Sequence, residues 1–422
     1  MRNVMSWISN LSRKRNQILL YLVVFVALVN PYTLSFLDPN PPLSNTDYFV
    51  IAAIHLLNLF AVVLFMLNRE VFVQFAIAGI FLILVELGIS PFVNPQSEYE
   101  FRLQNPEPYL NAEYYSKEFI DESFSQPGRW ILDSVYGGVK PDNFVGQWFN
   151  VENHRRRTTN TDGPFQNTIY LFGGSTVYNS EVPDALTIAS QLAGLGANEA
   201  SFEVVNMGAT SIHSTQQFAR LRTEVQLNEG DIVVFYDGVN DVHQRIVYEN
   251  QEGYMYGDPK NESIFLKALR LAATYSSIAK FLLDTMIDNV RPISISLVDE
   301  SVSNYVETLR DVKNYVIGQN AIFIHFLQPT LFTKATLNDY ETSLIEFGYP
   351  FVTKQSKLAF EAAYPKIMER LQAEEYSVSL IDSFDKLDLS PYLDFCHVNH
   401  IGNEVIANQI WSEIALRLDS NR

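Results

Sequence analysis

The sequence predicts an α/β fold in which helices cover both faces of a parallel sheet, preceded by transmembrane helices at the N-terminus. Three observations predict it. Short apolar runs alternate with amphipathic segments from about residue 166 to the end, and three long apolar stretches precede residue 94. The two parts also differ sharply in charge. We therefore expect a membrane anchor over residues 1–93, a connector over 94–165 and a globular domain over 166–422.

The composition suits a membrane part joined to a soluble part. Hydrophobic residues make up 47% of the 422 residues and charged residues only 18%, and the charged share is low for an ordinary soluble domain. Residues 1–93 hold five basic and four acidic side chains, so nearly all of the net charge of −18 lies beyond them. A domain this acidic repels phosphate groups, which excludes nucleic acid as an expected partner.

Three apolar stretches predict the anchor. They cover about residues 17–36, 48–67 and 71–93, and each approaches the roughly 20 residues that a helix needs to cross a ~30 Å hydrocarbon core. An Asn30-Pro31 pair interrupts the first stretch. No small-residue cleavage site follows it at the place where a secretory signal would be cut, so we predict a multi-pass anchor.

The charged flanks predict how this anchor is oriented. Basic residues at 13–15 precede the first stretch and Arg69 lies in the turn between the second and the third, whereas the 37–47 connection holds only acidic charges. Positive charges stay on the cytoplasmic side of a membrane. The N-terminus is therefore expected in the cytoplasm and, after three crossings, residues 94–422 are expected on the extracytoplasmic side.

The connector shows no helix or strand period. It is polar and rich in aromatic residues and prolines, and its one basic cluster is Asn-His-Arg-Arg-Arg at 153–157. We interpret this cluster as a solvated or locally ion-paired strand. A site for an anionic substrate is the alternative.

Five apolar runs predict the strands of the sheet. The expected strands are 168–172, 202–205, 231–236, 321–327 and 377–381, and the expected helices include 186–198, 214–227, 301–317, 355–375 and 402–418. Apolar strands that alternate with amphipathic helices are typical of a parallel sheet with both faces covered. Ligands of such sheets bind beyond the carboxyl ends of the strands, so the residues directly after each strand carry the information about function.

Four short motifs lie at these places. Gly-Gly-Ser-Thr (173–176), Asn-Met-Gly-Ala-Thr-Ser (206–211) and Gly-Val-Asn-Asp (238–241) follow the first three strands, and Asp-Phe-Cys-His (394–397) precedes the last helix. Together they resemble the four sequence blocks of the SGNH (GDSL-like) hydrolase superfamily over about residues 165–418. The resemblance implies a three-layer αβα, flavodoxin-like SGNH domain.

The chemistry of acyl transfer explains the residue types in these motifs. A serine hydroxyl attacks an acyl carbon only if a base takes its proton and donors stabilise the oxyanion. Ser175, on a glycine turn at a strand end, is the predicted nucleophile, His397 the predicted base, and Asp394 the group that orients the imidazole. The resemblance implies an oxyanion hole made of the backbone N–H groups of Ser175 and Gly208 and the side-chain amide of Asn240.

Each motif alone has an ordinary explanation. Gly-Gly-Ser-Thr is usually a strand-to-helix cap, and Gly-Val-Asn-Asp is an ordinary tight turn. The first motif also lacks the aspartate of the family's namesake Gly-Asp-Ser-Leu, which supports the turn and takes no part in the triad. His400 has a less suitable spacing from Asp394 than His397 has, and we interpret it as a polar residue at a helix N-terminus.

Two other enzyme classes fit the sequence less well. Asp-Gly-Val-Asn-Asp at 237–241 resembles the metal-binding block of haloacid-dehalogenase phosphatases, but those proteins need an Asp-x-Asp motif where the first strand here ends in Gly-Gly-Ser. The α/β-hydrolase elbow Gly-x-Ser-x-Gly is missing, because position 177 is valine. Cys396 is the only cysteine, and no metal-ligand spacing occurs. We therefore expect no metal and no cofactor.

The predicted function is a serine esterase that removes O-acyl, mainly acetyl, groups from an extracytoplasmic glycan. Its expected partners are this acylated glycan, or another ester substrate, and the membrane. An O-acyltransferase that modifies a cell-surface polysaccharide is one alternative, since it shares the acyl-enzyme and differs in excluding water. A non-catalytic glycan-binding assembly component is a second alternative, against which the complete triad argues.

Overall fold

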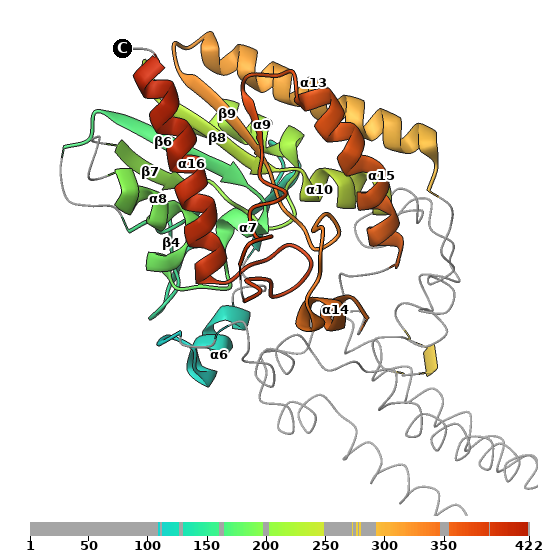
Figure 1. Ribbon diagram of the computed structural model, residues 1–422. Helices are drawn as coiled ribbons and strands as arrows, with labels where there is room; N and C mark the ends of the chain where they lie inside the picture. Colours follow the sequence, from blue (N-terminus) through green and yellow to red (C-terminus); the bar gives the residue numbers. More distant parts are fainter. Residues whose placement is uncertain are drawn as a thin grey trace, which may run out of the picture. The chain divides into compact units, whose positions relative to one another are not determined.

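The computed structural model describes most of the chain beyond residue 108 (Figure 1). The described residues are 109, 112–125, 130–159, 164–196, 202–248, 272, 276, 278–279, 293–346, 354–387 and 389–420. Nearly all of them belong to one compact unit, Asn94–Tyr275 with Ala279–Arg422. The three stretches predicted to cross a membrane lie outside the described residues. Among the helices that are described, none combines the length and the apolar character that a membrane span requires.

A five-stranded parallel sheet forms the centre of this unit. Its strands are β6 (Asn167–Gly173), β7 (Phe202–Asn206), β8 (Ile232–Asp237), β9 (Ile322–Leu327) and β10 (Ser377–Ser379). Their order in the sheet is β10-β9-β8-β6-β7, with every neighbouring pair parallel (Figure 1). This is the flavodoxin-like strand order. β7 is added on one side of β6, and the strands from β8 onward are added on the other side. All five predicted strands are confirmed, with ends that differ by at most two residues.

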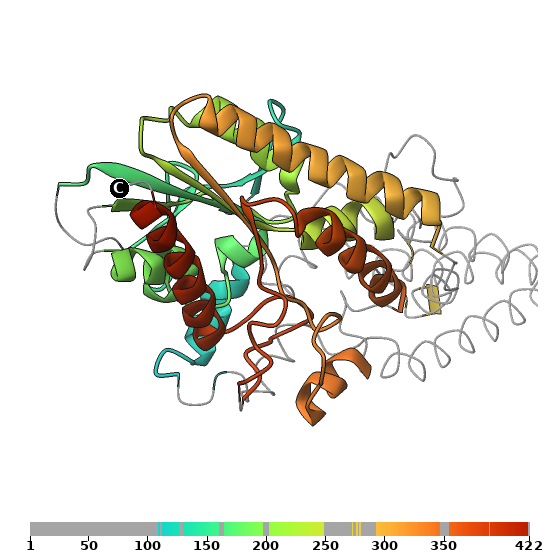
Figure 2. The same ribbon diagram turned by 45° about the horizontal axis from the view of Figure 1, so that its top comes forward.

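Five helices cover the sheet (Figure 2). α8 (Ile188–Gly196) and α16 (His400–Ser420) pack together on one face, and α9 (Ser214–Glu224), α13 (Ile295–Ile317) and α15 (Lys354–Leu371) follow one another on the other face. Right-handed crossovers explain the division, because the connections from β6 to β7 and from β8 to β9 run in opposite directions along the sheet. The central strand β8 is buried at all six positions, which explains the run of apolar and aromatic residues that precedes Asp237 at its carboxyl end.

Short helices begin where the strands end. α7 (Ser175–Tyr178) follows β6, and α10 (Val239–Val242) follows β8 and continues into the π-helix η3 (His243–Tyr248). α14 (Asp339–Glu346) lies in the connection between β9 and α15. These turns bring the first and third sequence motifs to the same edge of the sheet.

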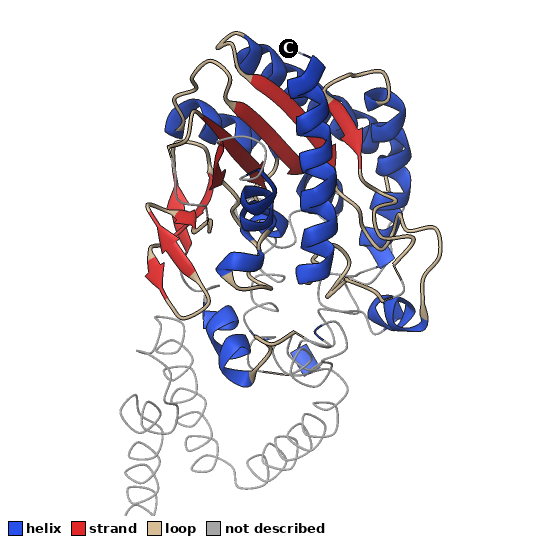
Figure 3. Cartoon of the chain, turned by 60° about the vertical axis from the view of Figure 1, so that its left-hand side comes forward, coloured by secondary structure: helices blue, strands red, loops and turns tan. Residues whose placement is uncertain are grey.

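The predicted connector contains secondary structure of its own (Figure 3). α6 (Lys117–Ser125) precedes a hairpin of β1 (Trp130–Asp133) and β2 (Gly138–Pro141), followed by an antiparallel sheet of β3 (Phe144–Val145), β4 (Asn150–Glu152) and β5 (Arg155–Arg156). Asn153 and His154, with φ of 53° and 61°, form the two-residue turn between β4 and β5. Two successive left-handed residues are typical of a type I′ hairpin turn.

Arg156 joins this small sheet to the central domain. Its side chain is fully buried, and its Nε donates to Asp184 Oδ1 at 2.7 Å. Its two terminal nitrogens donate to the carbonyls of Asn179 (3.1 Å) and Val182 (2.9 Å), and the guanidinium lies 4.2 Å from the centre of the Phe149 ring. The middle arginine of the predicted basic cluster is thus ion-paired and supports the fold.

Aromatic residues of the connector also pack against the loop before α16. Tyr109, Phe119, Ile120, Phe149 and Leu393 form one buried apolar cluster. Leu393 directly precedes the last sequence motif, so the connector supports the loop that carries this motif.

Candidate active site

The turn after β6 exposes the hydroxyl of Ser175. A Cβ on Gly173 would lie 2.5 Å from the Tyr236 carbonyl oxygen, and a Cβ on Gly174 would lie 2.2 Å from Asn240 Nδ2. Only glycine therefore fits at position 173, and a side chain at position 174 would displace the Asn240 amide. Ser175 opens α7 and is partly exposed. Its backbone N–H lies in the first helical turn, where no carbonyl of the same helix can accept it.

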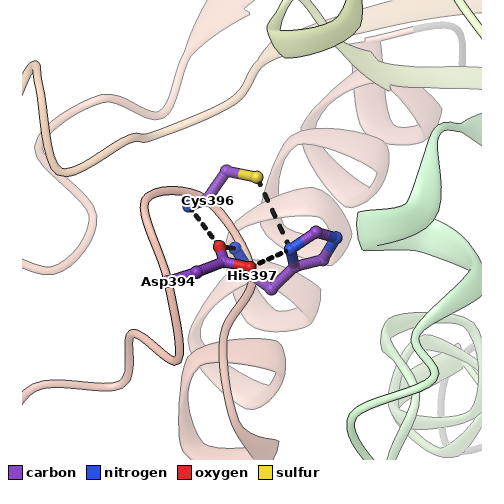
Figure 4. A group of neighbouring side chains, drawn as sticks. All are labelled: Asp394, Cys396 and His397. Atoms are coloured by element: carbon purple, nitrogen blue, oxygen red, sulfur yellow. Dashed lines mark hydrogen bonds and ion pairs between the residues drawn. The ribbon is translucent and has the colours of Figure 1, made fainter. Parts of the chain in front are cut away.

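The loop before α16 brings a histidine and an aspartate to this serine. His397 Nε2 lies 2.7 Å from Ser175 Oγ. His397 Nδ1 lies 2.6 Å from Asp394 Oδ2, and Figure 4 shows these two side chains facing each other. A carboxylate can only accept hydrogen bonds, so Nδ1 carries the proton and Nε2 is left to accept the serine hydroxyl. The structure thus brings together the three residues of the predicted triad.

Backbone groups of the same loop hold Asp394. Its Oδ1 accepts the N–H groups of Cys396 (2.8 Å) and His397 (2.7 Å), while the side chain is almost completely buried. Burial acts to raise the pKa of this carboxyl, but the charge of His397 and the hydrogen bonds outweigh burial and lower the pKa to about 2. Asp394 is therefore ionised at every pH at which an esterase would work.

Asp394 shifts the pKa of the imidazole in the opposite direction. Burial acts to lower the pKa of His397, but the carboxylate of Asp394, aided by Cys396 and Glu181, raises it well above its usual range. The side chain remains 17% exposed. His397 is thus a stronger base than a free imidazole, and its cationic form is stabilised by the neighbouring carboxylate.

Two of the predicted oxyanion donors differ in whether an N–H remains for the substrate. Asn240 Nδ2 donates to the Ile212 carbonyl at 2.9 Å and packs against Gly174, next to the serine. That bond uses one of its two amide hydrogens, which leaves the other for a substrate. The N–H of Gly208 instead donates to Asn206 Oδ1 at 2.8 Å.

Gly208 therefore differs from the expectation that it presents its N–H to the substrate. A Cβ at this position would lie 2.3 Å from Tyr178 N and 2.7 Å from Val177 C. The glycine is required by close packing against the backbone of α7. Asn206, to which the sequence analysis assigned no role, connects the two segments, because its Nδ2 also donates to the Val177 carbonyl at 2.8 Å.

Two further polar contacts support the site. The side-chain amide of Gln328 donates to Thr176 Oγ1, next to the nucleophile, and both side chains are buried. Asp241 accepts the hydroxyl of Ser214 at 2.5 Å. The only sequence signal for Gln328 is its position directly after β9.

Two other histidines, His400 and His325, are engaged away from Ser175. His400 opens α16, and its Nδ1 lies 3.2 Å from the Tyr114 hydroxyl. His325 is fully buried between Ser377 Oγ (2.7 Å) and Asp237 Oδ1 (3.2 Å). Of these three histidines, His397 is the one that contacts the serine.

A metal ion is an alternative occupant of this loop. The donor atoms that could bind it lie within 4.8 Å of one another and belong to Asp394, Cys396 and His397 (Figure 4). A metal would need the thiolate of Cys396 and the lone pair of His397 Nδ1. Burial raises the pKa of the Cys396 thiol to about 12, and Nδ1 is hydrogen-bonded to Asp394. The group therefore fits a hydrogen-bonded Asp–His pair better than a metal centre.

Comparisons with known proteins find similarity in structure but not in sequence. No protein-family model matches the chain, and no curated protein matches it significantly. Among solved structures, a member of the lipolytic G-D-S-L family from Veillonella parvula is similar over 58% of this chain and 97% of its own, with 10% identity and a TM-score of 0.33.

Two acetylxylan esterase structures are similar to the same extent. One is 14% identical, covers 58% of this chain and 98% of its own, and has a TM-score of 0.33. The other, a catalytic mutant of the enzyme from Geobacillus stearothermophilus, is 14% identical with a TM-score of 0.34, over 59% of this chain and 94% of its own. At these values, the case for a function rests on the side chains described above.

Proposed function

We propose that the chain is an SGNH-type serine esterase that acts through an acyl-enzyme. The observation that carries this proposal is the continuous hydrogen-bonded chain from Ser175 Oγ through His397 to Asp394, with distances of 2.7 and 2.6 Å. It lies at the carboxyl edge of a parallel sheet, where the Asn240 amide packs against the turn of the serine.

Each step of the reaction has a group to perform it. His397 Nε2 takes the proton of Ser175 as Oγ bonds to the acyl carbon, and the Asp394 carboxylate stabilises the imidazolium. The Ser175 N–H and the Asn240 amide donate to the oxyanion. Nε2 then gives its proton to the leaving alcohol, whose bond to the acyl carbon breaks. In the second half Nε2 takes a proton from water, whose oxygen attacks the acyl carbon, and returns a proton to Ser175 Oγ as the acid leaves.

We further propose that the substrate is an O-acetylated glycan outside the cytoplasm. The support for the location comes from the sequence, in which three apolar stretches have basic cytoplasmic flanks, and the acidic domain repels anionic lipids and nucleic acids, which disfavours both as substrates. Reporter fusions after residue 93 test the location, and they should show extracytoplasmic activity. A cytoplasmic signal from those fusions would contradict it.

A serine-directed probe tests the proposed nucleophile. A fluorophosphonate should label the full 422-residue chain, and Ser175→Ala should abolish both the labelling and ester cleavage. Ser211→Ala is the matched control, because it removes a hydroxyl from the loop after β7 and should leave the labelling intact. Labelling that persists in Ser175→Ala would disprove the nucleophile. A parent chain that resists the probe and cleaves no ester would favour the non-catalytic glycan-binding component.

The fate of the acyl group separates an esterase from an acyltransferase. The full chain should be incubated with short nitrophenyl esters and with acetylated glycans, including acetylated xylan, while free acetate and acetyl groups on added glycan acceptors are both measured. Release of free acetate at the rate of ester cleavage is the expected result. Transfer to an acceptor at a rate above that of acetate release would instead assign the same acyl-enzyme to a transferase.

A further inference from the structure

Asp241 is a buried carboxylate next to the proposed oxyanion donor. It follows Asn240 in α10 and is 2% exposed. Its Oδ1 accepts the Ser214 hydroxyl at 2.5 Å, and its two oxygens lie 3.2 and 3.3 Å from the Ser214 backbone nitrogen. None of the ion pairs in the described part of the chain includes Asp241.

A carboxylate in this position costs stability. Burial, and then the neighbouring Asp237, raise the pKa of Asp241 to about 7. Asp237 itself accepts the Tyr305 hydroxyl at 2.5 Å, and the charge of Arg245 acts in the opposite direction, to lower the pKa of Asp241. A buried acid outside the described ion pairs carries a desolvation cost, and its hydrogen bonds to Ser214 are the contacts that join it to the loop before α9.

Asp241 and Asn240 hold neighbouring points of one loop. Asn240 Nδ2 donates to the carbonyl of Ile212, and Asp241 accepts from Ser214, two residues further along the same loop. The loop therefore cannot move along α10 without breaking both contacts. Since the Ile212 carbonyl holds one hydrogen of the Asn240 amide, the position of the loop determines where the other hydrogen points.

We propose that Asp241 is a positioning residue for the Asn240 amide, an inference that rests on the proposed esterase function. Through Ser214, its carboxylate keeps the loop in the place from which Ile212 orients the amide toward the oxyanion. The oxyanion exists only in the transition state, so losing this orientation lowers kcat and leaves substrate binding unchanged. A purely structural role, in which Asp241 stabilises the N-terminus of α9, would lower stability and leave kcat per folded molecule unchanged.

Asp241→Asn in the full chain tests the proposal. The variant keeps the size of the side chain but turns an N–H toward Ser214. Loss of a direct oxyanion donor costs about 10²–10³ in rate, and for an indirect effect we expect kcat to fall about 10- to 100-fold. KM should stay within about threefold and fluorophosphonate labelling should slow by the same factor as kcat. The acid limb should stay above the ordinary histidine value, because Asp394, which raises the pKa of His397, is untouched.

Ser214→Ala gives an independent measurement. It removes only the hydroxyl that Asp241 accepts, so kcat should fall less than in Asp241→Asn, and the double variant should be no slower than Asp241→Asn alone. Unchanged kcat in both folded variants, or a rise in KM alone, would overturn the role of Asp241. If Asp241→Asn failed to fold, a parent-like kcat in Ser214→Ala would have the same effect. Failure of the esterase proposal is distinct, because the parent chain would then cleave no ester and resist the probe.

Discussion

His397 and His400 lie three positions apart, but their surroundings make only the first of these two a candidate for the general base. Asp394 raises the pKa of His397 well above its usual range and orients it toward Ser175. Burial lowers the pKa of His400, which lies at the start of α16 beside Tyr114. The same side chain is thus a strong base at one position and a weak one at the other.

Replacing each histidine by alanine should show this difference. His397→Ala removes the imidazole that contacts the serine hydroxyl, and kcat/KM for ester cleavage should fall by roughly 10³-fold or more. His400→Ala, the matched control, should stay within about tenfold of the parent, which corresponds to ~1.4 kcal/mol of barrier. Steady-state kinetics on chains checked for folding by circular dichroism would measure both. Equal losses in two folded variants would show that the base was wrongly assigned.

The pH dependence of activity should reflect the Asp394–His397 pair. His397 acts as a base only when neutral, and its pKa is raised, so the acid limb of kcat/KM should lie above the ordinary histidine value of ~6.5. Asp394→Asn removes the charge that raises this pKa, so the limb should move to lower pH. The rate on the plateau should fall by up to ~10⁴-fold, because the amide favours the wrong tautomer. A limb that stayed in place in Asp394→Asn would show that another group controls it.

At the scale of elements, replacing either of two glycines by alanine should change the free energy of unfolding in opposite directions. Gly194 is exposed in α8 with nothing within 4 Å of an added Cβ, whereas Gly208 packs against the backbone of α7. Gly194→Ala should raise the free energy of unfolding by about 0.5–1 kcal/mol, as in other exposed helix positions. Gly208→Ala should lower it by about 1–3 kcal/mol through overpacking, and should also slow ester cleavage because it displaces the helix that carries Ser175.

Denaturant unfolding of both variants would measure these changes. A Gly208→Ala chain as stable and as active as the parent would show that the loop after β7 can move away from α7. The parent-like activity expected of Gly194→Ala serves as the control for a helix position remote from the site.

The sequence predicts an element well where neighbouring residues determine it, and poorly where a contact between distant segments does. The apolar run of β8 arises because the sheet is covered on both faces, and that run is visible in the sequence. The strands can therefore be predicted from their hydrophobic pattern, and the triad from the order of the motifs that follow them. Whether Gly208 can donate its N–H to a substrate depends on where the Asn206 side chain points. The spacing of residues in the motif does not determine that orientation. The contact between Gln328 and Thr176 joins residues 152 positions apart, and it becomes visible only once β9 lies near β6.

At the scale of the whole molecule, the segment between the predicted anchor and the sheet is part of the folded domain. Its strands β3, β4 and β5 are too short to show a period in the sequence, so it was predicted only as a connector. Arg156 from β5 bonds to three groups in the segment that follows α7. Phe119 and Phe149 pack with Leu393 beside the triad loop.

Arg156→Ala should show how strongly this segment stabilises the domain. The side chain is fully buried and Asp184 is 12% exposed, so the substitution leaves a carboxylate without its cation and an empty space beside Phe149. Breaking a buried pair from one side costs about 3–5 kcal/mol. Arg157→Ala is the matched control, because it removes the same charge from an exposed neighbour and should change the free energy of unfolding by no more than about 0.5 kcal/mol. Denaturant unfolding of the full chain would measure both, and equal stability of the two variants would show that the connector folds independently of the sheet.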